Sequence, residues 1–122
     1  MKVDAAQVLK KKVRVGKVEE IPPGTKKLIQ TELENVLVVN VEGEFYAVSN
    51  TCPHAGGYLN YGPLTGYVIE CPLHFWPFDV RTGQLVQMEE SGLEEQLNRY
   101  ETLVEEGVLF ILIPEFNFPA QL

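Results

Sequence analysis

Short runs of apolar and alternating residues, separated by turn signals, make up most of the chain. Apolar side chains that recur at every second position, or in brief β-branched runs, are typical of strands. Strands are predicted over residues 13–18, 27–31, 36–41, 45–48, 67–70, 78–80, 100–104 and 108–113. The turn sequences 42–44 (Glu-Gly-Glu) and 105–107 (Glu-Glu-Gly) join two pairs of these strands into predicted hairpins. The expected fold class is therefore all-β, built of antiparallel sheets.

Two segments depart from the strand pattern and are predicted to be helical. Residues 4–12 favour a helical turn or two with Asp4 as the cap. Residues 88–98 favour a short helix capped by Ser91, with Glu94 at the spacing of a capping box. The tail, residues 114–122, carries two phenylalanines and is expected to pack against the rest of the chain.

The length and hydropathy of the chain predict a single domain over residues 1–122. The longest apolar run, Val108 to Ile113, is far shorter than the roughly 18 residues that indicate a membrane span. The first residues, Met1 to Asp4, lack the apolar core of a secretory signal. We therefore expect no membrane association and a cytoplasmic location.

The net charge of −7 is unevenly distributed along the chain. Residues 1–27 hold eight basic and three acidic side chains, 8 − 3 = +5, whereas residues 28–122 hold two basic and fourteen acidic ones, 2 − 14 = −12. An acidic surface of this kind repels nucleic acid, so nucleic acid is not an expected partner. The acids either steer the protein to a basic patch on a protein partner or serve solubility alone.

Every cysteine and histidine of the chain lies in one of two short segments. The first contains Cys52 and His54, and after 16 intervening residues the second contains Cys71 and His74. Thiolate is a soft ligand for iron and imidazole a neutral one, and each segment offers one of each. Two such loops that meet at the end of a β-scaffold would place two sulfurs on one iron and two nitrogens on another.

The residues between the ligands suit a bound cluster. Gly56, Gly57 and Gly62 allow the backbone to approach a bulky group, and Pro53 and Pro72 fix the chain just after each cysteine. Three other uses of the four residues remain open: a Cys2His2 zinc site, a disulfide between the cysteines, and a Cys/His nucleophilic pair. The tight CxH spacing disfavours zinc, a reducing compartment disfavours the disulfide, and the duplicated Cys and His disfavour the nucleophile.

The two segments, CxH and CxxH at this interval, resemble the ligand loops of the Rieske family. The resemblance extends to residues 78–83 (Phe-Asp-Val-Arg-Thr-Gly), and it covers about residues 36–113. It implies three stacked antiparallel sheets with a small cluster-binding subdomain, whose loops occupy about residues 50–80. It also implies one Rieske-type [2Fe-2S] cluster, with Cys52, His54, Cys71 and His74 as its ligands.

Several positions depart from the family pattern. Phe75 occupies the place where glycine usually follows the second ligand histidine, so the backbone is expected to follow a path that tolerates a side chain. The residues after each histidine include no extra cysteine and no hydroxyl to donate to sulfur, which predicts a potential toward the low end of roughly −150 to +300 mV. No proline occurs between Pro77 and Pro114, and the acidic residues 88–98 take the place of the usual covering loop.

The aromatic residues near the ligands are expected to serve mainly in packing. Trp76, the only tryptophan, is interpreted as a core anchor, with shielding of the cluster from water as the functional alternative. Phe45, Phe75 and Phe78 are interpreted as core or loop packing.

The resemblance implies a one-electron transfer protein, a Rieske ferredoxin that carries electrons between a reductase and a terminal oxygenase or another oxidoreductase. The chain would then be an electron-transfer component and not an enzyme. Two alternatives are kept: a small Rieske subunit of a larger oxidoreductase such as a nitrite reductase, and a zinc-stabilised interaction module.

Overall fold

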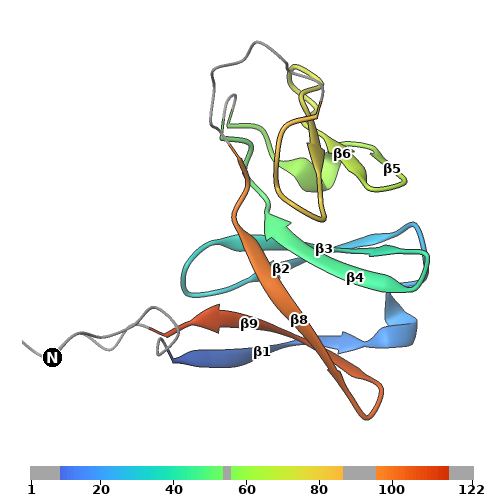
Figure 1. The fold of residues 1–122 in the computed structure, drawn as a ribbon, viewed down its shortest axis with the longest axis vertical. Helices are drawn as coiled ribbons and strands as arrows, with labels where there is room; N and C mark the ends of the chain where they lie inside the picture. Colours follow the sequence, from blue (N-terminus) through green and yellow to red (C-terminus); the bar gives the residue numbers. More distant parts are fainter. Residues whose placement is uncertain (1–8, 54–55, 87–95, 116–122) are drawn as a thin grey trace, which may run out of the picture.

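The computed structural model describes residues 9–53, 56–86 and 96–115. A larger sheet forms a base and a smaller sheet lies above it, toward the top of Figure 1. The larger sheet has the order β1-β9-β8-β4-β3-β2, with β1 (Lys10–Lys17), β2 (Lys26–Gln30), β3 (Asn35–Val41), β4 (Glu44–Ser49), β8 (Arg99–Glu105) and β9 (Val108–Pro114). The smaller sheet has the order β5-β6-β7, with β5 (Leu64–Thr65), β6 (Val68–Glu70) and β7 (Pro77–Asp79). The all-β prediction is confirmed.

The base is one continuous sheet, whereas the family resemblance implies two sheets there. Antiparallel pairing of Ala47 with Tyr100 and of Val48 with Arg99 joins β4 to β8 and makes the six strands continuous. The two predicted hairpins, β3–β4 and β8–β9, form as expected and lie on either side of this junction.

Strand β3 is buried on both faces, which explains the unbroken apolar run from Val36 to Val39. Val36 and Val38 belong to a core inside the curled base sheet, and Leu37, Val39 and Val41 belong to a second core beneath the smaller sheet. A strand covered on both faces reads as an apolar run and not as an alternating pattern. Strand β3 thus separates the two cores and contributes side chains to both.

The base sheet curls so that its two edge strands, β1 and β2, approach each other. The Nζ of Lys27 on β2 donates to the carbonyl of Val15 on β1 at 2.7 Å. Lys11 on β1 pairs with Glu32, which follows β2, at 2.9 Å. Side chains therefore close the gap that backbone pairing leaves between the two edges.

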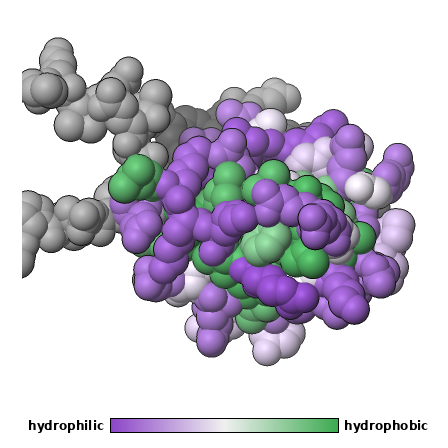
Figure 2. Space-filling view, turned by 90° about the horizontal axis from the view of Figure 1, so that it is seen from below, coloured by the Kyte–Doolittle hydropathy of each residue, from purple (hydrophilic) through white to green (hydrophobic). Residues whose placement is uncertain are grey.

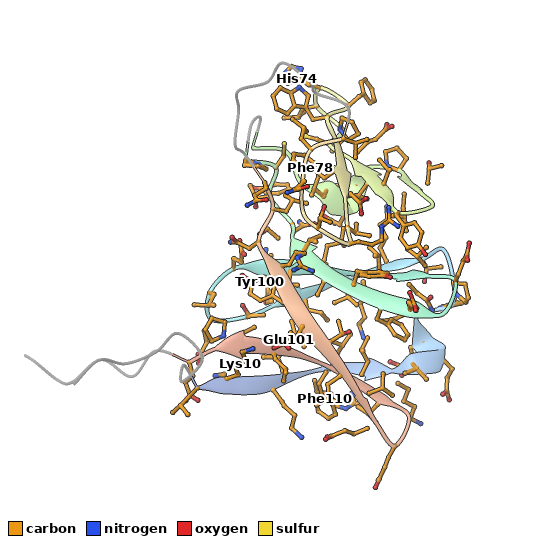
Figure 3. The ribbon with its side chains drawn as sticks, in the orientation of Figure 1. Lys10, His74, Phe78, Tyr100, Glu101 and Phe110 are labelled. Carbon is orange, nitrogen blue, oxygen red and sulfur yellow. The ribbon has the colours of Figure 1, made fainter. Side chains whose placement is uncertain are left out.

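Charged side chains of the neighbouring strands cross the outer face of β9, which carries apolar side chains. Because β9 lies between β1 and β8, the ion pairs Lys10–Glu101 and Lys12–Glu105 cross it. The Nζ of Lys12 also lies 4.8 Å from the ring centre of Phe110. Figure 2 shows an apolar patch bordered by hydrophilic side chains on this side of the molecule, and Figure 3 labels Lys10, Glu101 and Phe110 there.

The two helix predictions fare differently. Residues 10–12, the end of the first predicted helix, form the start of β1 and pair with β9, so that prediction is wrong for these residues; residues 4–8 lie outside the described part. Residues 88–95 of the second predicted helix also lie outside it, and Gln96 forms an isolated bridge with Gln84. Among the described residues, no helix has the length and apolar character needed to cross a membrane.

Glu34 ties together three segments at the junction between the base and the smaller unit. Its Oε2 accepts hydrogen bonds from Ser49 Oγ at 2.9 Å, from Asn98 Nδ2 at 3.1 Å and from the hydroxyl of Tyr100. Burial, together with the hydrogen bond to Glu34, raises the pKa of Tyr100 above its ordinary value. Ser49 lies three residues before Cys52, so this contact fixes the chain where it leaves the base.

We predict that Glu34→Ala lowers the free energy of unfolding by about 2 kcal/mol, because it leaves the partly buried Tyr100 hydroxyl without its acceptor. Glu32→Ala is the matched control, since the Glu32 side chain is 72% exposed in its ion pair and its loss is expected to cost no more than about 0.5 kcal/mol. Denaturation of the two variants side by side measures the difference. Equal effects would contradict the role given to Glu34.

Candidate functional site

Both cysteines lie at the base of loops that leave strands of different sheets. Cys52 follows β4 of the base and Cys71 follows β6 of the smaller sheet. Their side chains are buried, with 1% and 0% exposed, in the core that also contains Leu59, Ile69 and Phe78. No disulfide joins the two cysteines. The structure therefore brings two thiols into the apolar core between the sheets.

The two cysteine loops close with the same hydrogen-bond pattern. In the first loop, the amide of Cys52 donates to the carbonyl of Gly57 at 2.8 Å and the amide of Gly56 donates back to Cys52 at 2.9 Å. In the second loop, Cys71 donates to Trp76 at 2.9 Å and Phe75 donates back to Cys71 at 2.7 Å. Each loop is thus a six-residue turn that begins Cys-Pro and reverses the chain above its own cysteine.

The two loops touch at Gly57. A methyl group placed on Gly57 would lie 2.8 Å from Cys71 Sγ and 3.0 Å from Cγ of Leu73, closer than such contacts allow. Gly62 makes a second close approach, because a methyl group there would lie 1.7 Å from the carbonyl oxygen of Glu70. Glycine at 57 and 62 therefore lets the chain after Cys52 pack directly against the segment that holds Cys71. The use expected from the sequence, close approach of the backbone to a bound cluster, stays a prediction.

The second histidine lies where the smaller unit meets solvent. His74 is exposed and lies at the top of Figure 3, on the same loop as the buried Cys71. His54 lies outside the described residues. Over residues 9–53, 56–86 and 96–115 no group of three or more Cys, His, Asp or Glu side chains is arranged to hold one metal ion. In the second loop, then, the sulfur points inward and the imidazole reaches the surface.

Phe75 keeps a backbone conformation that favours glycine. Its φ is +59°, close to the +76° of Gly56, which holds the matching position in the first loop. This φ lies in the small left-handed region that an L residue can occupy, so the backbone accepts the Phe75 side chain, but at a steric cost. The loop keeps the left-handed turn and carries the strain of a Cβ in it. The Phe75 ring is 65% exposed, so the interpretation of Phe75 as a packing residue is wrong.

The other aromatic predictions agree with the structure. Phe78 is fully buried in the core beneath the smaller sheet, and the partly buried Trp76 packs against the same core. Phe45 packs against the core inside the base. Trp76 therefore packs the second loop against this core, in agreement with its interpretation as a core anchor.

Asn50 supports the first loop and was missed in the sequence. Its side chain is 2% exposed, accepts from the amide of Asn60 at 2.8 Å and donates to Oδ1 of Asn60 at 2.8 Å. The carbonyl of Asn50 accepts from Leu59 at 2.7 Å. Two asparagines ten residues apart give no spacing signal, because their pairing depends on how the loop folds back.

The segment after the second loop joins the two sheets through stacked side chains. The guanidinium of Arg81 lies 4.0 Å from the ring centre of Tyr67, and Tyr67 meets Tyr46 of β4 edge to face at 5.9 Å. Asp79 holds Arg81 in place, and its hydrogen bond with the Arg81 side chain lowers the pKa of the Asp79 carboxyl. The hydrogen bond to Glu44 raises the pKa of Tyr46 to about 12. These contacts fix the orientation of the smaller unit on the base.

Comparison with known proteins places this architecture in a family. The family described as "Rieske [2Fe-2S] domain" matches residues 11–101. The ferredoxin subunit of a biphenyl dioxygenase from Pseudomonas sp. (strain KKS102) is 41% identical over 56% of this chain and 63% of its own length. The chain thus spans less than two thirds of that relative. The ferredoxin subunit of a 3-phenylpropionate/cinnamic acid dioxygenase from Shigella flexneri is 33% identical over 80% of this chain and 90% of its own length.

A solved structure supports the same assignment. A ferredoxin from a complex of reduced oxygenase and oxidized ferredoxin in carbazole 1,9a-dioxygenase is 30% identical to this chain, with a TM-score of 0.76. The likeness covers 87% of this chain and 97% of that one. The arrangement of the base and the smaller sheet is therefore shared with that ferredoxin.

We predict that Phe75→Gly raises the free energy of unfolding by about 1 kcal/mol, because glycine adopts a positive φ without steric cost. Phe75→Ala retains a Cβ and is expected to give no such gain. Gly56→Ala makes the opposite change at the matching position of the first loop and serves as the control. Gly56 has a φ of +76° and no described atom lies within 4 Å of an added methyl group, so backbone strain alone should destabilise this variant. Thermal melting of the three variants tests the effect. A less stable Phe75→Gly protein would show that the ring, not the backbone, governs stability here.

Proposed function

Because this chain belongs to the Rieske [2Fe-2S] domain family, we propose that it is a one-electron carrier that takes electrons from a reductase and passes them to a terminal oxygenase. The relatives named as ferredoxin subunits of dioxygenases support this function. The ferredoxin that has been solved in complex with its oxygenase supports the second half of the path. We therefore favour a mobile carrier over the fixed small subunit of a nitrite reductase, and an electron-transfer component over an enzyme.

The cofactor is one [2Fe-2S] cluster, as the family match indicates. We propose Cys52, His54, Cys71 and His74 as its four ligands. The single observation that carries this proposal is that two loops of the same hydrogen-bond pattern hold the two thiols buried beneath them. Gly57 lies so close to Cys71 Sγ that any side chain at this position would displace the sulfur. The buried thiols of Cys52 and Cys71 and the exposed imidazole of His74 thus fit a cluster that is bound by sulfur on its core-facing side and by imidazole on its solvent-facing side.

The bound cluster would supply the chemistry, which is the gain and loss of a single electron. The chain's own residues would hold and surround it. The apolar core around Cys52 and Cys71 would keep water from the sulfur side. The exposed imidazole of His74 would bring the other side to the surface, where a partner can approach. The contacts of Glu34 with Ser49 and of Arg81 with Tyr67 would keep the smaller unit fixed on the base while a partner protein binds.

We propose further that residues 1–122 behave as one domain, because β9 continues past the family match and pairs with both β1 and β8. The cytoplasm is the compartment that we propose, since a reducing environment keeps both thiols available for iron. A reductase and a terminal oxygenase are the protein partners that we propose for this compartment.

The purified protein is expected to be coloured and to hold two iron and two acid-labile sulfide atoms, as a [2Fe-2S] cluster requires. Elemental analysis with optical and EPR spectra measures this. Colourless protein that holds one zinc ion would contradict the proposed ligand set and favour the zinc module instead.

A pair of glycine variants sharpens that measurement. Gly57→Ala should lower the iron and sulfide content, because its methyl group would displace Cys71 Sγ. Gly66→Ala should keep the cluster, since Gly66 has a φ of +59° but no described atom within 4 Å of an added methyl group. Equal loss in both variants would attribute the effect to instability and not to the sulfur site.

The midpoint potential is expected toward the low end of roughly −150 to +300 mV, because the residues after each histidine offer no hydroxyl donor to sulfur. Fewer donors leave the reduced, more negative state less stabilised. Protein-film voltammetry measures the midpoint directly. A value well above zero would show that donors elsewhere in the chain compensate.

A further inference from the structure

We propose that Lys26 raises the midpoint potential of the cluster, because its ammonium group is held next to the chain that leads into Cys71. This inference rests on the proposed function, since it requires the cluster on its four proposed ligands. It adds a residue of the base, outside both cysteine loops, that helps to set how readily the cluster accepts an electron.

Strand β2 directs its two lysines to opposite faces of the base sheet. Lys26 pairs with Val39 of β3, and Lys27 pairs with Val38. Residues directly opposite each other in an antiparallel pair carry their side chains on the same face of the sheet. Val39 belongs to the core beneath the smaller sheet, and Val38 belongs to the core inside the base. Lys26 therefore faces the smaller unit, whereas Lys27 faces the inside of the curled base.

A hydrogen bond fixes the charged end of Lys26 on the smaller unit. Its Nζ donates to the carbonyl of Gly62 at 2.5 Å, and this contact is partly buried. Gly62 ends η3 (Leu59–Tyr61), a short 3-10 helix in the chain after the first cysteine loop. Because the ammonium group is anchored there, its charge acts from a fixed position and not from a side chain that moves through solvent.

Gly62 lies directly against the backbone that leads into the second cysteine. A methyl group on Gly62 would lie 1.7 Å from the carbonyl oxygen of Glu70, and the amide of Glu70 donates to the carbonyl of Pro63 at 3.1 Å. Glu70 directly precedes Cys71, whose side chain is buried. One hydrogen bond and one close backbone contact thus separate the Lys26 ammonium from the residue before a proposed ligand.

The charge of Lys26 is not neutralised by an ion pair. Four other lysines of β1 and β2 each pair with a glutamate: Lys10, Lys11, Lys12 and Lys27. Within residues 9–53, 56–86 and 96–115, no carboxylate forms such a pair with Lys26. With its histidines neutral, the segment from Asn50 to Phe78 carries one charged residue, the acidic Glu70. The positive charge that Lys26 brings to this segment is therefore not supplied by the segment itself.

A positive charge in this place favours the reduced state of the cluster. Reduction adds one electron, so the reduced cluster is more negative by one charge than the oxidised one. A fixed ammonium group attracts the more negative state more strongly, and a partly buried position screens this attraction less than bulk water does. Lys26 therefore raises the midpoint potential and partly offsets the absence of hydroxyl donors after the two histidines.

The test measures the midpoint potential of cluster-loaded variants near neutral pH by protein-film voltammetry. Lys26→Met removes the charge and keeps an apolar stem, Lys26→Gln removes the charge and keeps a donor, and Lys26→Arg keeps both. Lys27→Met is the matched control, because Lys27 is the neighbouring residue and also donates to a backbone carbonyl, that of Val15, at 2.7 Å. The optical spectrum and iron content of each variant show that the cluster is loaded before the potentials are compared.

Lys26→Met and Lys26→Gln are expected to lower the equilibrium constant for reduction about fivefold, as the loss of one partly screened charge does. For a one-electron couple this is a fall of about 40 mV, since a tenfold change corresponds to about 59 mV. Lys26→Arg and Lys27→Met should keep the wild-type midpoint, although Lys27→Met also loses a hydrogen bond to a carbonyl. Thermal melting of the same variants records the loss of stability separately.

Three results would overturn the role of Lys26 while leaving the proposed function in place. The first is an unchanged midpoint in Lys26→Met, and the second is an equal fall in Lys26→Met and Lys27→Met. The third is a wild-type midpoint in Lys26→Gln beside a lowered one in Lys26→Met, which would assign the effect to the hydrogen bond and not to the charge. Wild-type protein that binds no redox-active iron–sulfur cluster would overturn the role of Lys26 and the proposed function together.

Discussion

The double burial of β3 is the constraint on which the rest of the structure depends. Because this strand faces one core with Val36 and Val38 and the other with Leu37 and Val39, it must lie between two layers. One layer is the far side of the curled base sheet, and the other is the small sheet with its two cysteine loops. Loss of either layer would expose a row of β-branched and leucine side chains to water. The cysteine loops are thus part of the packing that makes the fold stable.

The two cysteines have two roles: both are buried in the core, and both are proposed ligands of the cluster. Cys52 and Cys71 fill positions in the shared core, while the loops above them turn the chain back with matching hydrogen bonds. Counted from the cysteine, the histidine is the third residue of the first loop and the fourth residue of the second. The two histidines therefore lie at different distances from the residue with the positive φ, which is the fifth in each loop. In the first loop Ala55 separates His54 from the left-handed position, and in the second Phe75 occupies that position directly. An aromatic ring beside the proposed ligand follows from this difference in spacing.

The sequence predicted the strands well, because the alternating and β-branched patterns depend on local burial. It failed where pairing decides the outcome: Lys10 to Lys12 have the composition of a frayed helix but form β1, since β9 offers them a partner. The two cysteine loops could be located from the clustering of all cysteines and histidines. The strained φ of Phe75 and the pairing of Asn50 with Asn60 could not, because both arise only when the loops close. The ligand set of Cys52, His54, Cys71 and His74 and the helix over residues 88–95 stay as predictions.

The closure of the base sheet by lysine side chains has a consequence for how the protein behaves among other molecules. An open sheet normally offers unpaired backbone groups at each edge, which recruit strands from other chains and lead to aggregation. Here Lys27 occupies a carbonyl of β1, and Lys11 reaches across to the loop after β2. The lysines also keep a strongly hydrated charge at both margins. For the electron carrier proposed above, edges that resist β-sheet growth would keep an encounter with a protein partner from turning into lasting attachment.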